Sequence, residues 1–369
     1  MVSEMMHRKS FAEAMSLLPL PDSDSPVQRL VAEQPAWFPG KGLFFERTAV
    51  IGDDPSGAGR KINAAGIHVY AQAPLAAARV VEKEERLNGK GRKEGRIGIH
   101  SIQGVFTNPG KVDRPFVYEV SKIATGRSFS TRLVNVRQPI EPSHNPDGPF
   151  TIDEAQRPLG EICFTCLTTF KRHLDGQDDV QSTAPPQVRF ADILSQRAPD
   201  EWPPCPQIDL DIVRSFHTDK DHGMFPMFDM YKVDMTDYNK DKHVTERREL
   251  IYYRPSHPID QDDVNAHIVS HGGESDRNGL LMLANYLGYG HSLSVVASLS
   301  YSFYIHVNPE EAVMDGKGWW IQEVEWPRTS AGRCMMETRT WSPEGKHVAS
   351  GYQDGLLIPR SKASAGNKL

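Results

Sequence analysis

The chain has 369 residues, of which 24% are charged, and a formal net charge of −6. This length exceeds one typical domain and suits two, at roughly 150 residues per domain. The slightly acidic balance supplies no basic surface for a phosphate backbone, and no apolar run approaches the roughly 18 residues of a membrane-spanning helix. We therefore expect a folded protein of two domains, with no nucleic-acid partner and no membrane span.

The ends of the sequence and its cysteines bear on location. The start, Met1 to Glu4, carries an acid early and lacks an apolar stretch, which argues against a secretory signal. Four cysteines in a chain of this length are typical of a reducing compartment. The last residues, Asn367-Lys368-Leu369, differ at one position from the peroxisomal address Ser-Lys-Leu. We expect an intracellular protein, either peroxisomal or cytoplasmic.

The first strong structural pattern is an alanine-rich helix at 64–87, in which Pro74 should introduce a kink. A strand follows and stops at Asn108-Pro109, because proline cannot donate to a strand ladder. Two later strands are joined by a bend at Gly126-Arg127. The strands of this half are predicted at 99–107, 116–120, 129–136 and 162–170.

The same series recurs in the second half. Ser275 is predicted to cap a helix at 279–287. The next strand stops at Asn308-Pro309, which lies 200 residues after the first Asn-Pro pair, and a bend follows at Gly332-Arg333. The strands of this half are predicted at 299–307, 319–324, 335–341 and 348–357. The chain therefore contains a duplication.

Each half is thus one helix followed by an antiparallel meander, and the two can bury each other's apolar faces if the sheet wraps the helix. The predicted class is α+β, a double hotdog made of two fused units. We place the N-terminal unit at 25–180 and the C-terminal unit, with the presumed active site, at 207–360. Between them lies a Pro-rich linker at 181–206, where proline density argues against continuous secondary structure, and a flexible tail follows at 361–369.

Two stretches resemble the acyl-CoA thioesterase II family. The residues from Tyr118 to Arg132, with Gly126-Arg127 between them, are similar to that family's first-half signature. The residues from Val348 to Gly355 resemble its closing strand. The resemblance spans most of 60–358. It implies hydrolysis of an acyl-CoA without a covalent acyl-enzyme, with coenzyme A as part of the substrate and no cofactor or metal.

The resemblance also implies site residues, because this family orients the attacking water with a carboxylate, a hydroxyl and a glutamine. By position the glutamine corresponds to Gln353, the hydroxyl to Ser298 and the carboxylate to Asn285, on the predicted second helix. An amide accepts a hydrogen bond from water but cannot take its proton near neutral pH. The catalytic set expected from the sequence is therefore Asn285, Ser298 and Gln353, with an amide in the place of the base.

Three explanations of this amide remain open. The alignment is shifted, the protein is a weak hydrolase, or another base serves, for which Glu274, His291 and His306 are nearby in sequence. An α/β-hydrolase is excluded because the chain has no Gly-x-Ser-x-Gly elbow.

The function predicted first is an acyl-CoA thioesterase. The alternatives are a non-hydrolytic double-hotdog enzyme acting on an acyl or polyketide-like substrate, and an acyl-binding protein that has lost turnover. Both alternatives are motivated by Asn285. Because unpaired sheet edges favour association, we also expect a homo-oligomer, most simply a dimer.

Overall fold

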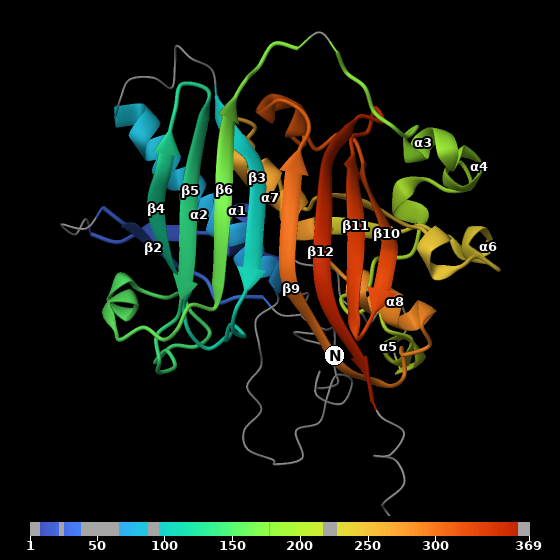
Figure 1. Cartoon of the computed structure of the whole chain (residues 1–369), viewed down its shortest axis with the longest axis horizontal. Helices are drawn as coiled ribbons and strands as arrows, with labels where there is room; N and C mark the ends of the chain where they lie inside the picture. Colours follow the sequence, from blue (N-terminus) through green and yellow to red (C-terminus); the bar gives the residue numbers. More distant parts are fainter. Residues whose placement is uncertain are drawn as a thin grey trace, which may run out of the picture.

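The computed structural model describes residues 8–21, 26–37, 66–87, 96–176, 178–216 and 227–360. Within these ranges the strands form a single sheet in the order β1-β2-β4-β5-β6-β3-β9-β12-β11-β10-β8-β7, which runs across the whole molecule in Figure 1. The strands of the first half are β1 (Leu17–Pro19), β2 (Gln28–Ala32), β3 (Ile97–Phe106), β4 (Val117–Thr125), β5 (Phe129–Arg137) and β6 (Phe164–Arg172). Those of the second half are β7 (Phe228–Lys232), β8 (Glu249–Pro255), β9 (Leu293–Ile305), β10 (Trp320–Ser330), β11 (Arg333–Trp341) and β12 (His347–Pro359).

The described residues form fewer α-helices than strands. The longer ones are α2 (Gly66–Leu87), α7 (Val264–Ser275) and α8 (Gly279–Tyr286). The short ones are α1 (Phe11–Ala14), α3 (Pro186–Arg189), α4 (Ala191–Leu194), α5 (Asp211–Phe216) and α6 (Thr236–Asn239), with 3-10 turns at Ile152–Gln156, Pro199–Glu201, Val244–Glu246 and Pro309–Ala312. In the described ranges, none of these helices combines the length and the apolar character needed to cross a bilayer.

The two halves meet at the two strands that the duplication predicts to be equivalent. β3 and β9 pair antiparallel, with Ser101 opposite Tyr304 and Val105 opposite Ser300. Antiparallel pairing of equivalent strands relates the two halves by an approximate twofold axis and makes their sheets continuous.

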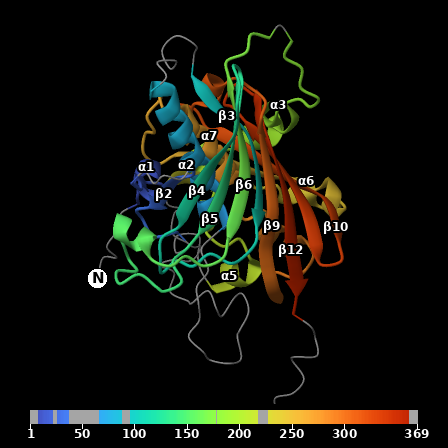
Figure 2. The same cartoon turned by 60° about the vertical axis from the view of Figure 1, so that its left-hand side comes forward.

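Two buried helices lie side by side behind the central strands (Figures 1 and 2). α2 contacts β3, β4, β5 and β6, whereas α7 contacts β3, β11 and β12. Their close approach depends on small residues, because a Cβ added at Gly273 would lie 3.3 Å from the Cβ of Ala71. A helix is therefore enclosed by the sheet in each half, as expected from the sequence.

The second-half helix differs from its prediction. Ser275 does not cap α8 but ends α7, where its hydroxyl donates to the carbonyl of Gly272 at 2.7 Å. α7 itself begins at Asp263, whose side chain accepts from the amide of Ala266. The outer strands β1, β2, β7 and β8 were not predicted from the sequence.

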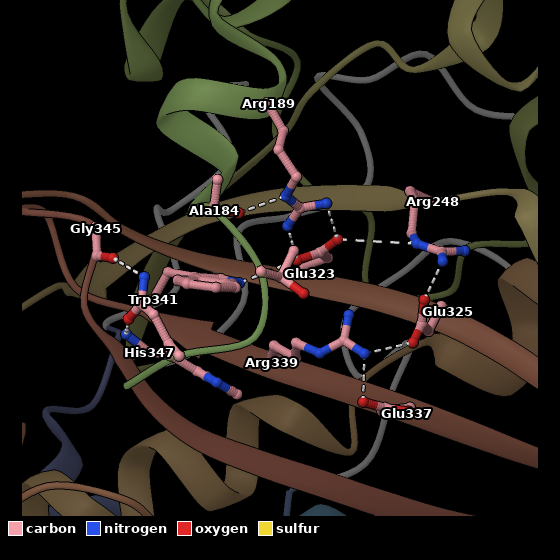
Figure 3. A network of polar contacts seen from close by, with 12 residues as sticks. Ala184, Arg189, Arg248, Glu323, Glu325, Glu337, Arg339, Trp341, Gly345 and His347 are labelled. Atoms are coloured by element: carbon pink, nitrogen blue, oxygen red, sulfur yellow. Dashed lines mark hydrogen bonds and ion pairs between the residues drawn. The ribbon is translucent and has the colours of Figure 1, made fainter. Parts of the chain in front are cut away.

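The residues that join the two halves pack on the outer face of the sheet, over the strands of the second half. Short helices α3 and α4 occupy part of the segment in which we expected no continuous secondary structure. Arg189 of α3 donates to both carboxylate oxygens of Glu323, at 2.9 and 2.6 Å (Figure 3). The fully buried Glu323 also accepts from the indole of Trp341 at 3.0 Å. This buried, fully paired carboxylate fixes the linker to β10 and β11.

Candidate active site

The break between α7 and α8 places an acidic side chain at the junction of the two halves. Asn278 adopts a left-handed backbone conformation, with φ at 55°, and precedes the first residue of α8. Asparagine tolerates this region better than most residues do. Asp276 is one of the three residues between α7 and α8, so it lies between the end of one helix and the start of the next.

Asp276 is hydrogen-bonded to the two residues that the sequence analysis selected from the strands. The hydroxyl of Ser298, on β9, donates to Oδ1 of Asp276 at 3.2 Å. The side-chain amide of Gln353, on β12, donates to the same oxygen and also to Oγ of Ser298, at 2.6 Å. β9 and β12 are adjacent, and their register shifts between Asp354 and Gly355. The structure therefore brings Ser298 and Gln353 together around a carboxylate.

Burial of Asp276 changes its proton affinity. Removal of the carboxyl group from water raises its pKa from 3.8 to about 7, and the hydrogen bond from Ser298 opposes that rise. Part of the Asp276 surface remains open toward a cavity. A carboxyl group with this pKa can take up and release a proton near neutral pH.

Two acceptor atoms at the site receive no hydrogen bond from the described residues. Oε1 of Gln353 is buried and has no hydrogen-bond partner among the described residues. Oδ2 of Asp276 likewise accepts no hydrogen bond from the part of the chain that the structure covers, and it faces Gly66 at the start of α2, where an added Cβ would lie 3.4 Å away. Oδ2 of Asp276 can therefore accept a hydrogen bond from a water molecule in the cavity, whereas burial closes Oε1 of Gln353 to water.

The three side chains line a cavity of about 380 Å³. This volume lies within the range of small-molecule sites, roughly 300–1,000 Å³. Both halves contribute to its walls, which are mostly apolar. The apolar lining includes Trp37, Ile67, Val69, Phe106, Phe116, Ile208, Leu280, Leu281 and Val296. The site therefore combines an apolar chamber with one carboxylate and its hydrogen-bond partners.

The expectation that Asn285 completes this hydrogen-bond set is wrong. Its amide donates to the carbonyl of Asp209 and accepts from the amide of Asp211, both at 3.0 Å. It lies near the end of α8, six residues and about 9 Å along the axis from Gly279. Asn285 lines a different cavity. It ties the segment before α5 to α8, and the carboxylate beside Ser298 and Gln353 is Asp276.

None of the three substitute bases considered from the sequence takes part in these contacts within the described residues. Burial raises the pKa of Glu274 to about 7, but its nearest cation is Arg277 at 3.9 Å and it makes no hydrogen bond to Ser298 or Gln353. His306 bonds to Ser350 at 2.9 Å. His291 is exposed.

Asp276 was missed because the sequence analysis treated the helix at 279–287 as the only helix of that half. The signal was present nonetheless. Asp276-Arg277-Asn278-Gly279 is a turn-forming run directly before an apolar helix, and acidic residues are common there. The same run places a carboxylate at the helix start rather than within it.

Two sheets that each wrap a helix, with one carboxylate at their junction, define a double-hotdog enzyme. Comparison with protein families agrees. Residues 63–151 match the acyl-CoA thioesterase N-terminal domain and residues 242–357 match the acyl-CoA thioesterase C-terminal domain, together more than half of the chain. The chain belongs to the acyl-CoA thioesterase family, and its activity as a thioester hydrolase follows from that membership. The resemblance found in the sequence is thereby confirmed.

Solved structures share the fold over nearly the whole chain. An acyl-CoA thioesterase II, TesB2, from Mycobacterium marinum is 19% identical with a TM-score of 0.56, and the match covers 95% of this chain and 98% of that one. A TesB protein from Mycobacterium avium subspecies paratuberculosis is 17% identical, with a TM-score of 0.55 and the same coverage. A putative thioesterase II from Thermobifida fusca is 13% identical, with a TM-score of 0.56, and the match covers 96% of this chain and 99% of that one. These matches confirm the double-hotdog fold. No curated protein matches the chain significantly.

Proposed function

We propose that Asp276 is the general base of acyl-CoA hydrolysis, with Gln353 and Ser298 as the groups that hold it and the attacking water. The observation that carries this proposal is the hydrogen-bonded set of three side chains in one cavity, in which Oδ2 of Asp276 accepts no hydrogen bond from the described residues. The water donates one proton to Oδ2 of Asp276, which leaves its lone pairs free to attack the thioester in the chamber.

The reaction needs no covalent intermediate on the protein. Asp276 takes one proton from the water, and the oxygen attacks the thioester carbonyl carbon. The tetrahedral intermediate then breaks its carbon–sulfur bond, which releases a carboxylic acid and the thiolate of coenzyme A. Asp276 returns its proton to the sulfur and is ready for the next substrate. A pKa of about 7 suits both directions of this transfer.

Ser298 is a positioning residue in this scheme rather than a nucleophile. Its hydroxyl proton is directed at Asp276, and its oxygen accepts from Gln353. The thioester carbonyl oxygen gains charge as water attacks. The first turn of α8 lines the cavity, and the partial positive charge of a helix start stabilises that oxygen.

The geometry also removes the reason for the non-hydrolytic alternative. That alternative rested on an amide in the place of the base, and a carboxylate is present at the site. An acyl-binding protein without turnover remains as an outcome of the test.

The test is release of free coenzyme A from short, medium and long acyl-CoAs by wild type, Asp276→Asn, Gln353→Ala and Asn285→Asp. Loss of a general base lowers the rate by roughly 10²–10⁴-fold. We expect that loss in Asp276→Asn, a loss of similar kind in Gln353→Ala, and no gain in Asn285→Asp. Full activity of Asp276→Asn, or a large gain in Asn285→Asp, would return the catalytic role to position 285. Tight acyl-CoA binding by an inert wild type would favour the binding protein.

We also propose that the chain forms a homo-oligomer. Val105, Met335 and Tyr352 expose large side chains on the outer face of β3, β11 and β12, which supports a homo-oligomer. Light scattering at micromolar concentration tests the homo-oligomer, and a monomeric mass would reject it.

The proposal of a peroxisomal location rests on Asn367-Lys368-Leu369, which lies outside the described residues. Co-localisation of the tagged full chain with a peroxisomal marker, compared with a chain lacking these three residues, tests that reading.

A further inference from the structure

The end of the Pro-rich linker presents two buried carbonyl groups to the second half of the chain. The amide of Cys205 donates to the carbonyl of Met230, on the edge strand β7, at 2.9 Å. Proline has no amide proton, so this pairing cannot continue through Pro206. Among the described residues, the carbonyls of Cys205 and Pro206 accept no hydrogen bond from the backbone. These two linker carbonyls are therefore available to side chains.

Side chains from the break between α7 and α8 bind the linker carbonyls. The side-chain amide of Asn278 donates to the carbonyl of Pro206 at 2.7 Å. Nη2 of Arg277 donates to the carbonyls of Pro206 and Cys205, at 3.2 and 3.4 Å. Arg277 and Asn278 are only 4% and 9% exposed, so a donor that lost its acceptor here would be left without water as well. The break is thus joined to the linker directly beside Asp276.

Asn278 does not perform the usual task of an asparagine at its position. It is the N-cap residue of α8, and an N-cap side chain commonly accepts a hydrogen bond from the first turn of its helix. The side chain of Asn278 makes no such bond. Its amide donates to the linker instead, so this side chain stabilises the position of the break and not the start of α8.

The same linker segment is held a second time, at the far end of α8. There Asn285 donates to the carbonyl of Asp209 and accepts from the amide of Asp211. Between the two attachments, Gln207 and Ile208 line the active-site cavity. The two attachments are alike in strength but differ in place, because only the one at the break adjoins the catalytic carboxylate.

We propose that Asn278 and Arg277 are positioning residues of the hydrolysis reaction. By holding the linker carbonyls they fix the break between α7 and α8, and with it the carboxylate of Asp276 against Ser298 and Gln353. A catalytic side chain has to be held within roughly 0.5 Å of its productive position. This role rests on the proposed function of Asp276 as the general base. It makes the linker between the two halves a support of the active site.

Steady-state kinetics on the acyl-CoA that wild type hydrolyses fastest tests the role of Asn278. Asn278→Gly removes the side-chain amide and keeps the left-handed backbone, which glycine adopts readily. We expect kcat to fall toward the 10²-fold loss that a misplacement of about 1 Å causes. KM should stay close to that of wild type, because the apolar walls of the cavity are unchanged. The matched control is Asn285→Ala, which removes two hydrogen bonds from the same segment and should keep the kcat of wild type.

A second pair of variants keeps the test valid if Asn278→Gly does not fold. Arg277→Met removes the donor to both linker carbonyls and should lower kcat. Arg277→Lys retains a donor and should recover most of that loss. Wild-type kcat in a folded Asn278→Gly chain, an equal loss in Asn285→Ala, or no recovery in Arg277→Lys would overturn the proposal.

Asp276→Asn, measured in parallel, separates this proposal from the proposed function. The double variant Asp276→Asn/Asn278→Gly should have the same kcat as Asp276→Asn alone, because no base is left to position. A further loss in the double variant, as large as the loss in Asn278→Gly, would overturn the positioning role. Wild-type kcat in Asp276→Asn would show instead that the proposed function itself is wrong.

Discussion

Substitution of Gly66 by alanine should damage catalysis without damaging the fold. Gly66 is the first residue of α2 and belongs to the half of the chain opposite to Asp276. An added Cβ would lie 3.4 Å from Oδ2 of Asp276 and 3.2 Å from Cε1 of Phe106. It would therefore occupy the space in front of the one carboxylate oxygen that the protein leaves open, which is where the attacking water should sit.

The size of the effect follows from this geometry. A displacement of about 1 Å at a reacting group costs about 10²-fold in rate, which is close to 3 kcal/mol of barrier. The helix propensity of alanine offsets part of the cost of moving the Phe106 ring, which would lie 3.2 Å from the new Cβ, so the change in stability should be small. We expect Gly66→Ala to lower kcat/KM by about 10²-fold while its melting temperature stays close to that of wild type.

Gly272 offers a matched control. It lies within the buried helix α7, and an added Cβ there would meet only Phe303 at 3.5 Å and Tyr70 at 3.7 Å, which are ordinary contacts. Release of coenzyme A should therefore be close to that of wild type in Gly272→Ala. Wild-type activity in Gly66→Ala, or an equal loss in both variants, would show that the water does not occupy the space between Asp276 and Gly66.

Four other outcomes follow from the charges and hydrogen bonds. Because burial raises the pKa of Asp276 to about 7, kcat/KM should rise as pH increases through an apparent pKa near 7, and a profile flat from pH 5 to 9 would contradict this. The unfolded chain ionises this carboxyl near pH 4, so the folded wild type loses stability between about pH 4 and 7. In urea unfolding, Asp276→Asn should therefore be more stable than wild type by roughly 4 kcal/mol at pH 8 and little different at pH 4. Asn285→Ala should lower the free energy of unfolding by about 1–3 kcal/mol, since it orphans two backbone groups, while kcat/KM stays unchanged. Glu323→Ala should cost about 1–3 kcal/mol because it leaves the buried indole N–H of Trp341 without its acceptor, whereas Glu337→Ala, after which Arg339 still pairs with Glu325, should cost at most about 1 kcal/mol; similar losses in the two would refute the role of the buried carboxylate.

The strands around the junction were predictable because their pattern is strong and local. β-branched and aromatic residues alternate up to Asn108-Pro109 and Asn308-Pro309, and each proline ends a ladder that it cannot join. Ser298 and Gln353 were selected from the sequence for the same reason, since both lie on strands whose neighbours match a family. The register of two adjacent strands then places their side chains together.

Asp276 was not selected from the sequence because its position depends on a break between two helices rather than on a periodic pattern of apolar residues. The sequence from Val264 to Ser275 contains two glycines and two histidines, and weak helix formers conceal α7 in a single sequence. Tertiary contacts stabilise α7 in place of helix propensity. For example, the hydroxyl of Tyr301 donates to Ser275 at 2.7 Å and fixes the end of α7 directly before the break. A resemblance carried along a continuous helix therefore selected Asn285, nine residues after the carboxylate that lies beside Ser298 and Gln353.

The pairing of β3 with β9 has a consequence for how the enzyme behaves on dilution. The cavity takes walls from both halves, including Gly66 from one and Asp276 from the other. If the halves were separate chains, the site would assemble only above the dissociation constant of their complex. Here β3 and β9 belong to one chain, so each strand is present at a high effective concentration for pairing with the other. Specific activity should therefore stay constant down to nanomolar enzyme, whatever higher assembly the chain forms.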